Sequence, residues 1–324
     1  MTFERTITTQ CGTNFKAIDT GAPDAPGYLT LVFLHGWGVP STAGIANRIA
    51  ELAFSQGVRF IGVNRRGYAG STPYSPEETR VFTEGASDER GDLYRGEGRH
   101  YVYMLDTLIK DGSIGEGGVA FVAWSAGNSY LSSMIDAINF VPGEVRERVS
   151  EKTKAFIYYA LHSLNRRRIA PADRYSAFLA WFASYFKHDL ASRDDEKLGT
   201  RADPTRTPTD QEEHFYPVMT DLAGATPGDA GIMSPDFEPF VRSARDSAFF
   251  SEATWKAWGQ PKISYVSAGA SLWMMVWAAW AMEDEVKAHN ALSRVTFKVI
   301  EEGNHYSLYD HPKETLQTFL ACAK

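Results

Sequence analysis

The feature that most constrains this 324-residue chain is a short apolar run that ends in a serine between small residues. Val119 to Ala123 has no charge and no breaking residue, as is typical of a strand buried on both faces of a parallel sheet. Trp124 and Ser125 come next, and a helical pattern follows over 126–139. The pattern predicts a strand, a tight turn that exposes a strained Ser125, and a helix. A serine that only caps this helix fits the same pattern.

The segment Ala123-Trp-Ser-Ala-Gly127 resembles the nucleophile elbow of the α/β-hydrolase family, Gly-x-Ser-x-Gly, with one extra methyl group at its first position. His35-Gly-Trp-Gly38 follows a buried-strand pattern and resembles the oxyanion loop of that family. His305 follows the last predicted strand, 294–300, as the catalytic histidine of the family does. Asn64 to Ser71 resembles the Arg-Gly-x-Gly-x-Ser loop of the family, to which we assign structural support and no chemistry.

The order of apolar runs predicts the fold. Strand patterns alternate with helical patterns from residue 28 to residue 161, which implies parallel crossovers and a doubly wound α/β sheet. The runs 3–9 and 14–19 predict an antiparallel hairpin at the N-terminus. Thr72 to Gly98 is rich in Pro, Gly and acidic residues and is interpreted as a surface loop, with a helix only from about His100 to Lys110.

From about residue 165 the alternation stops, and it returns with the strand at 262–266. We therefore expect a core domain made of residues 1–164 and 261–324, interrupted by a helical cap or lid at 165–260. The family resemblance implies the same place for a cap. The uncharged stretch Ile263 to Met282 is long enough for a membrane span, but its serines and Gly269 favour a buried strand and turn followed by a helix.

The resemblance implies an acyl-transfer mechanism. Ser125 would be the nucleophile and His305 the base, and the backbone amides of Trp37 and Ala126 would form the oxyanion hole. The acid is unassigned, because neither strand exit that usually carries it in the family, Ser267 to Leu272 or Leu161 to Asn165, contains a carboxylate. Glu302, three residues before His305, is the candidate we favour over Glu301 and the run 283–285.

Aromatic residues are concentrated in the predicted lid, where they fit either a core or a large apolar pocket. We expect substrate contacts from His35, Trp124, His162, Trp181 and Phe182. The predicted function is hydrolysis of an ester, thioester or lactone of a bulky, largely apolar small molecule through an acyl-enzyme on Ser125. Two alternatives remain open. One is a C–C bond hydrolase, cyclase or acyltransferase of secondary metabolism with the same site, and the other is a non-catalytic ligand-binding receptor on the same fold.

Composition and motif content limit the kinds of partner that we expect for this protein. The net charge of −7 and the absence of a long basic run argue against nucleic acid. No metal-ligand spacing and no Gly-x-Gly-x-x-Gly after the first strand occurs, so we expect no metal and no cofactor. Cys11 and Cys322, at opposite ends of the chain, suit a reducing compartment, and the N-terminus has no secretory pattern, so we expect a cytoplasmic protein. The expected partner is a hydrophobic small-molecule substrate, and a homodimer is left open.

Overall fold

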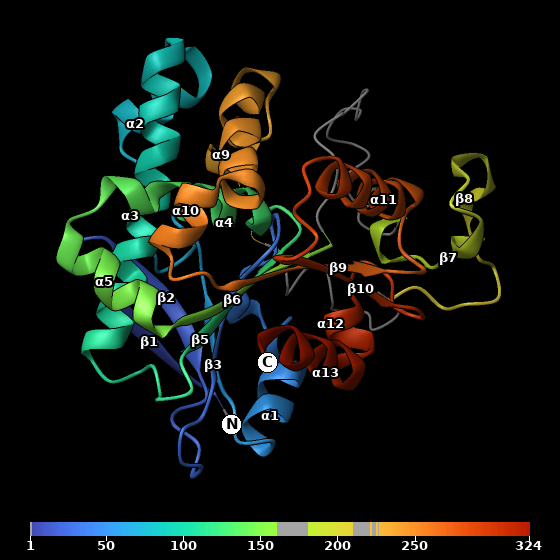
Figure 1. The fold of residues 1–324 in the computed structure, drawn as a ribbon, viewed down its shortest axis with the longest axis horizontal. Coiled ribbons are helices and arrows are strands. Elements are labelled where there is room, and N and C mark those ends of the chain that lie inside the picture. Colours follow the sequence, from blue (N-terminus) through green and yellow to red (C-terminus); the bar gives the residue numbers. More distant parts are fainter. Residues whose placement is uncertain (1, 161–180, 210–220, 222–224, 226) are drawn as a thin grey trace.

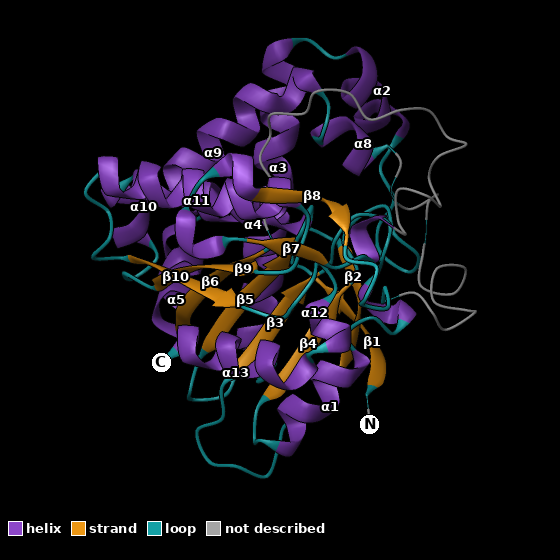
Figure 2. Ribbon diagram, turned by 90° about the vertical axis from the view of Figure 1, so that its right-hand side faces the viewer, coloured by secondary structure: helices purple, strands orange, loops and turns teal. Residues whose placement is uncertain are grey.

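A twisted sheet runs through the centre of the molecule (Figures 1 and 2). The computed structural model describes residues 2–160, 181–209, 221, 225 and 227–324. In these residues the sheet has eight strands, in the order β1-β2-β4-β3-β5-β6-β9-β10. The parallel strands are β3 (Thr30–Leu34), β4 (Arg59–Val63), β5 (Val119–Trp124), β6 (Thr153–Tyr159), β9 (Lys262–Ala268) and β10 (Val295–Ile300). The predicted mostly parallel α/β sheet is confirmed.

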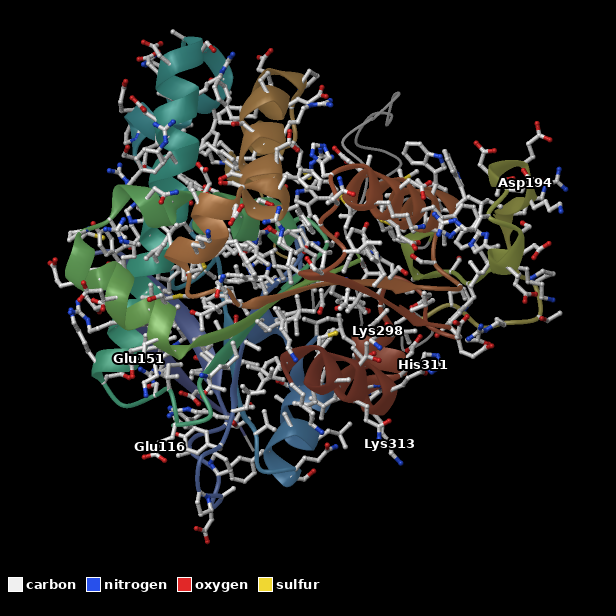
Figure 3. All side chains as sticks on the ribbon, viewed as in Figure 1. Glu116, Glu151, Asp194, Lys298, His311 and Lys313 are labelled. Atoms are coloured by element: carbon white, nitrogen blue, oxygen red, sulfur yellow. The ribbon has the colours of Figure 1, made fainter. Side chains whose placement is uncertain are left out.

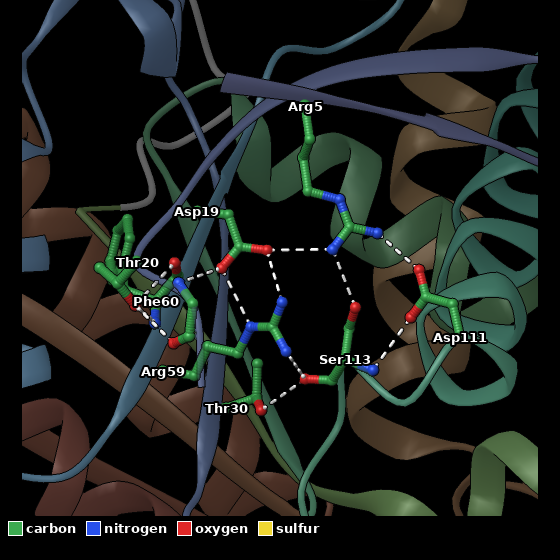
Figure 4. A network of polar contacts seen from close by, with 9 residues as sticks. Arg5, Asp19, Thr20, Thr30, Arg59, Phe60, Asp111 and Ser113 are labelled. Atoms are coloured by element: carbon green, nitrogen blue, oxygen red, sulfur yellow. Dashed lines mark hydrogen bonds and ion pairs between the residues drawn. The ribbon is translucent and has the colours of Figure 1, made fainter. Parts of the chain in front are cut away.

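The two N-terminal strands extend this sheet at one edge. β1 (Phe3–Thr8) and β2 (Asn14–Asp19) form the predicted antiparallel hairpin, and β2 also pairs antiparallel with β4. At the end of β2, Asp19 accepts hydrogen bonds from Arg59 at 2.7 and 3.0 Å and from Arg5 at 3.0 Å (Figure 4). Arg59 also donates to the carbonyl oxygen of Ser113, beyond the end of α3 (Ser87–Lys110). A buried ionic cluster therefore fastens the hairpin to β4 and to the turn after α3.

Helices cover both faces of the sheet, as Figure 2 shows. α4 (Gly127–Asp136), α5 (Gly143–Lys152), α9 (Glu238–Phe250) and α10 (Glu252–Ala257) lie with α3 on one face. α1 (Asn47–Ser55), α12 (Ser307–Asp310) and α13 (Pro312–Ala323) lie on the other. Short 3-10 helices occur at Ser41–Ala43, Ala137–Phe140, Leu190–Ser192, Asp195–Lys197 and Pro235–Phe237. Each face buries its own apolar cluster, because the parallel strands carry apolar side chains on both faces.

The interpretation of residues 72–98 as a surface loop is wrong. α2 (Pro76–Glu84) occupies the first part, and α3 begins at Ser87 rather than near His100. The side chain of Ser75 caps α2 by accepting from the amide of Glu78, whose carboxylate accepts from the amide of Ser75 in return. Charged residues that suggested a loop form ion pairs on the surface of these helices instead, as between Arg80 and Glu89 at 2.5 Å.

The described part of the predicted lid contains a hairpin as well as helices. β7 (Phe186–His188) and β8 (Leu198–Ala202) pair antiparallel, and α8 (Gly228–Ile232) precedes α9. Val241, Ala244 and Phe249 of α9 belong to the same apolar cluster as α3 and α4, so α9 covers the sheet. The division into a core and a lid at 165–260 stays a prediction, since residues 161–180 and 210–220 lie outside the described part.

The uncharged stretch Ile263 to Met282 forms most of β9 and the first part of α11 (Trp273–Ala288), as the serines and Gly269 predicted. Among the helices that the structure describes, none combines the length and the apolar character that crossing a bilayer requires.

Most charged side chains lie on the outside of the molecule, as Glu116, Glu151, Asp194 and Lys313 do in Figure 3. The described residues also include charged side chains that are almost completely buried, among them Asp19, Arg59, Arg65, Arg66, Glu97, Asp106 and Asp229. Burying an ion without partners is very costly, so each of these side chains marks a specific interaction.

Candidate active site

Ser125 stands at the exit of β5, at the carboxyl edge of the sheet. Its φ of +54° lies in the left-handed region, which a residue with a Cβ atom rarely adopts. A Cβ atom on Gly127 would lie 2.7 Å from the carbonyl oxygens of Leu34 and His35, so only glycine fits where α4 begins. The predicted strand, strained turn and helix are all present, and the N-cap of α4 is Ala126, with no side-chain hydrogen bond, so Ser125 does not cap this helix.

Asn128 stabilises this turn through its side-chain amide. The sequence patterns assigned no role to this residue. It is fully buried, and its Nδ2 donates to the carbonyl oxygen of Ser125 at 2.8 Å and to that of Tyr159 at 2.9 Å. Tyr159 ends the neighbouring strand β6. Asn128 thus ties the strained turn to the next strand exit. An asparagine three residues after the serine is what the sequence shows of this contact.

The structure brings His305 to Ser125, 180 residues earlier in the chain. Nε2 of His305 lies 3.1 Å from Oγ of Ser125, a hydrogen-bonding distance for a base and its nucleophile. His305 is 2% exposed, and its backbone carbonyl accepts from Nε1 of Trp124 at 3.0 Å. The aromatic ring of Phe182 meets the imidazole edge-on, with centroids 5.0 Å apart. The pair is therefore held in a water-poor, aromatic surrounding.

The loop after β3 lies directly against the elbow. A Cβ atom on Gly36 would lie 3.1 Å from the Cβ of Ser125 and 3.0 Å from the ring of Trp124, so the backbone could not approach with a larger residue. The peptide between Gly36 and Trp37 therefore lies beside Ser125. Ala126 immediately precedes α4, where the first amide groups of a helix have no partner within the helix. The two predicted oxyanion donors are thus on adjacent stretches of backbone, and their role stays a prediction.

His35 supports this loop. It is fully buried, and its Nε2 accepts from the backbone amide of Arg65 at 3.1 Å. Nδ1 must then carry the ring proton, which it donates to the carbonyl oxygen of Gly36 at 2.7 Å. Burial, helped by the charge of Arg65, holds the pKa of His35 well below its usual value, so the ring is neutral. Both ring nitrogens of His35 thus bond to backbone groups of the protein, and the expected contact of His35 with substrate stays a prediction.

The loop that carries His305 is anchored on the segment between β6 and β9. Asn304 is fully buried, and its Nδ2 donates to the carbonyl oxygen of Ala183 at 2.6 Å and to Oγ1 of Thr209 at 2.8 Å. Oδ1 of Asn304 accepts from the amide of Tyr306 at 2.9 Å. The position of His305 thus depends on residues that lie about 100 positions earlier in the chain.

Four of the five carboxylates considered for the acid form ion pairs with arginines. Glu302 pairs with Arg206 at 3.0 Å, and its side chain is 74% exposed. Glu283 and Asp284 pair with Arg193, Glu285 pairs with Arg245, and Glu301 is exposed. These contacts direct Glu302 toward Arg206, and its assignment as the acid stays a prediction.

Of the remaining residues predicted to contact substrate, three lie at or near His305 and one lies outside the described residues. Trp124 is 1% exposed and packs under His305 and Tyr306. Phe182 lies on His305, and the half-buried Trp181 packs edge-on against Phe182. His162 lies outside the described residues. No group of three or more His, Cys, Asp or Glu side chains within the described ranges could hold a metal ion.

Comparison with known proteins agrees with the fold. A profile of the alpha/beta hydrolase family matches residues 31–318, so the chain belongs to the α/β-hydrolase family. Three solved structures show the same fold. They are a thioesterase domain from the curacin biosynthetic pathway (14% identity, TM-score 0.54), a serine hydrolase involved in carbazole degradation (14%, 0.53) and an esterase from Exiguobacterium antarcticum (13%, 0.52). Each alignment covers 99% of this chain and 98 or 99% of the other. No curated protein sequence matches the chain.

Proposed function

We propose that this α/β-hydrolase is a serine hydrolase that cleaves an ester, thioester or lactone of a bulky, largely apolar small molecule. The observation that carries the proposal is the hydrogen-bonding distance of 3.1 Å between Ser125 Oγ and His305 Nε2, on a turn strained at φ +54°. A strained turn is maintained only where its surroundings enforce it, and such turns cluster at sites of chemistry. The aromatic side chains near His305 support an apolar substrate.

The chemistry has two steps. Oγ of Ser125 attacks the carbonyl carbon while Nε2 of His305 takes the hydroxyl proton, and the amides of Trp37 and Ala126 stabilise the oxyanion. The tetrahedral intermediate then expels the alcohol, thiol or ring oxygen, which takes the proton from His305 and leaves an acyl-enzyme. In the second step water attacks the acyl carbon and loses a proton to His305, which passes this proton to Ser125 Oγ as the bond between Oγ and the acyl carbon breaks and the acid leaves.

Labelling with a fluorophosphonate probe tests the proposal. Ser125 Oγ bonds to phosphorus, fluoride leaves, and His305 takes the proton, so labelling reports an activated serine. We expect the wild type to be labelled at Ser125 and Ser125→Ala to remain unlabelled at unchanged thermal stability. Ser129→Ala, four residues further along, is the matched control and should be labelled like the wild type.

A wild type that is unlabelled, or a Ser125→Ala variant that is labelled equally, would refute the nucleophile and leave a ligand-binding role as the better explanation. Product analysis with the unlabelled wild type then separates hydrolysis from C–C cleavage, cyclisation and acyl transfer, because hydrolysis of an ester or thioester releases an acid and an alcohol or thiol in equal amounts, and hydrolysis of a lactone releases one hydroxy acid.

A further inference from the structure

A completely buried ion pair lies behind the oxyanion loop. Arg65 follows β4 and Asp229 lies on α8, 164 residues later, and they are 0% and 2% exposed. Nη1 of Arg65 donates to Oδ1 of Asp229, and Nη2 donates to Oδ2 at 2.7 Å. The hydroxyls of Tyr68 and Tyr130 donate to the same carboxylate, so its acceptor sites are satisfied. The guanidinium lies between these two aromatic rings, with its carbon 5.0 and 4.4 Å from their centroids.

Stability alone does not account for this pair. Taking two ions out of water costs several kcal/mol each, and well-packed apolar residues often serve a core equally well. Burial opposes the charge of Arg65, but the attraction of Asp229 outweighs it and raises the pKa of Arg65. A permanent positive charge is thus maintained in the interior, next to backbone that adjoins Ser125.

The donors of Arg65 that Asp229 leaves unused bind the oxyanion loop. Nη2 donates to the carbonyl oxygen of Gly36 at 2.9 Å, and Nε donates to that of His35 at 3.0 Å. In a planar trans peptide the carbonyl and the following amide point in opposite directions. Holding the oxygen of Gly36 toward Arg65 therefore turns the amide of Trp37 to the other side of the peptide plane. His35 Nδ1 donates to the same oxygen, so two donors fix this one peptide.

The next residues of the loop are fixed from the same cluster. The hydroxyl of Tyr68 accepts from the amide of Gly38 at 2.8 Å while it donates to Asp229. The ion pair and the tyrosine thus hold the loop on both sides of Trp37. Hydrogen bonds on a peptide oxygen, above all from a cation, also polarise the peptide and strengthen its amide as a donor.

We propose that Arg65 is a positioning residue for the oxyanion hole, and that Asp229, Tyr68 and Tyr130 hold its guanidinium against the carbonyl of Gly36. The proposal rests on the proposed function, since it assigns a role in stabilising the oxyanion formed at Ser125. It also makes α8, a part of the chain remote from Ser125 in sequence, a support of the catalytic step.

The next arginine provides a matched comparison. Arg66 forms an equally buried ion pair with Glu97 on α3, at 2.5 Å, and a second one with Glu78 at 2.8 Å. The side chain of Arg66, like that of Arg65, follows the end of β4, but it extends in the other direction, toward α2 and α3. Glu97→Gln therefore weakens a buried pair beside the site while leaving the contacts of Arg65 with the oxyanion loop in place.

The test is the kinetics of fluorophosphonate labelling, normalised to the folded fraction measured by near-UV circular dichroism. Attack on phosphorus develops charge on the phosphoryl oxygen, as attack on a carbonyl does. We expect the maximal labelling rate constant to fall on the order of tenfold in Tyr68→Phe and about a hundredfold in Asp229→Asn and Arg65→Lys, compared with 10²–10³ for loss of a whole oxyanion donor. The probe concentration at half the maximal rate should stay the same, because ground-state binding does not use the oxyanion donors.

Glu97→Gln should label at close to the wild-type rate per folded molecule. Labelling of Tyr68→Phe and Asp229→Asn within twofold of Glu97→Gln would overturn the role of Arg65 while leaving Ser125 as the nucleophile. A rise in the half-maximal concentration with an unchanged maximal rate would overturn it equally. If Asp229→Asn and Arg65→Lys do not fold, Tyr68→Phe, which deletes only one oxygen atom, decides alone. An unlabelled wild type instead rejects the proposed function itself.

Discussion

At the scale of single residues, Ser125 stores backbone strain that the rest of the elbow maintains. Its left-handed conformation costs a residue with a Cβ atom roughly 1–2 kcal/mol. Asn128 and the close packing of Gly36 and Gly127 against their neighbours keep the turn in place. The position therefore favours glycine for stability and serine only for its hydroxyl group.

The strain at Ser125 predicts that glycine at this position gives a more stable protein than alanine, the reverse of the order within a helix. Ser125→Gly should be more stable than Ser125→Ala by about 1 kcal/mol, because only glycine adopts a positive φ without cost. Ser132, buried within α4, is the control. There Ser132→Ala should be the more stable of the two variants by about 1 kcal/mol. Urea unfolding measures the stability of the glycine and alanine variants at both positions. If Ser125→Ala were more stable than Ser125→Gly, as is usual within a helix, the strain at Ser125 would be contradicted.

At the scale of elements, α3 and α4 cross at a glycine. A Cβ atom on Gly98 would lie 2.1 Å from the backbone oxygen of Ser133, whereas one on Gly96 would meet only the end of the Arg99 side chain at 3.9 Å. The closest approach of the two helices is thus permitted by one missing side chain. α4 begins next to Ser125, so the crossing also helps to place the elbow.

Alanine at the two glycines should act in opposite directions. Gly98→Ala should lower the free energy of unfolding by about 1–3 kcal/mol or more, because backbone has to move to make room. Gly96→Ala in the same helix should raise it by up to about 1 kcal/mol through helix propensity. Thermal and urea unfolding of both variants check this, and a neutral Gly98→Ala would show that the helices are not in such close contact.

The strand at Val119 and the first half of α3, which contains Gly98, show which elements could be predicted from the sequence and which could not. The strand at Val119 was evident because a charge-free run is what a doubly buried strand requires. The first half of α3 was missed because its glycines and charged residues lower the local helix signal. Those residues are explained by tertiary contacts, namely a helix crossing and ion pairs. The capping box at Ser75 and Glu78 was the readable sign that helices begin there.

The candidate site also contains residues that the sequence could indicate and contacts that it could not. Ser125 and His305 could be predicted because their local backbone, a strand exit with small neighbours, imposes a visible pattern. The contact between Arg65 and Asp229 joins residues 164 positions apart and leaves no periodic trace. The expectation that Asn64 to Ser71 supports the site stays a prediction, and the partners of this segment could be known only from the fold.

At the scale of the whole molecule, the N-terminal hairpin is joined to the rest by the ionic cluster around Asp19. Asp19 is fully buried and pairs with Arg59 and Arg5, which in turn reaches Asp111 at the end of α3. β2 pairs with β4 over only three residues. The cluster therefore adds side-chain links to the backbone hydrogen bonds and the apolar packing that connect the hairpin to the parallel sheet.

Removing this carboxylate should destabilise the protein as a whole. Asp19→Ala leaves a buried arginine without its partner, and the expected loss is about 3–5 kcal/mol. Glu4→Gln, which breaks the exposed pair with Lys16 in the same hairpin, should cost less than about 1 kcal/mol. Urea unfolding measures both, and hydrogen exchange of the hairpin amides locates the effect. Equal losses in the two variants would contradict a special role for the cluster.

The chain between β6 and β9 holds both halves of the site. Through Asp229 it reaches the oxyanion loop, and through Ala183 and Thr209 it reaches the loop of the base. For protein engineering, this means that the segment is no interchangeable module. A graft from another hydrolase would have to bring an anion for Arg65 and acceptors for Asn304, or the recipient would lose its catalytic alignment together with its old specificity.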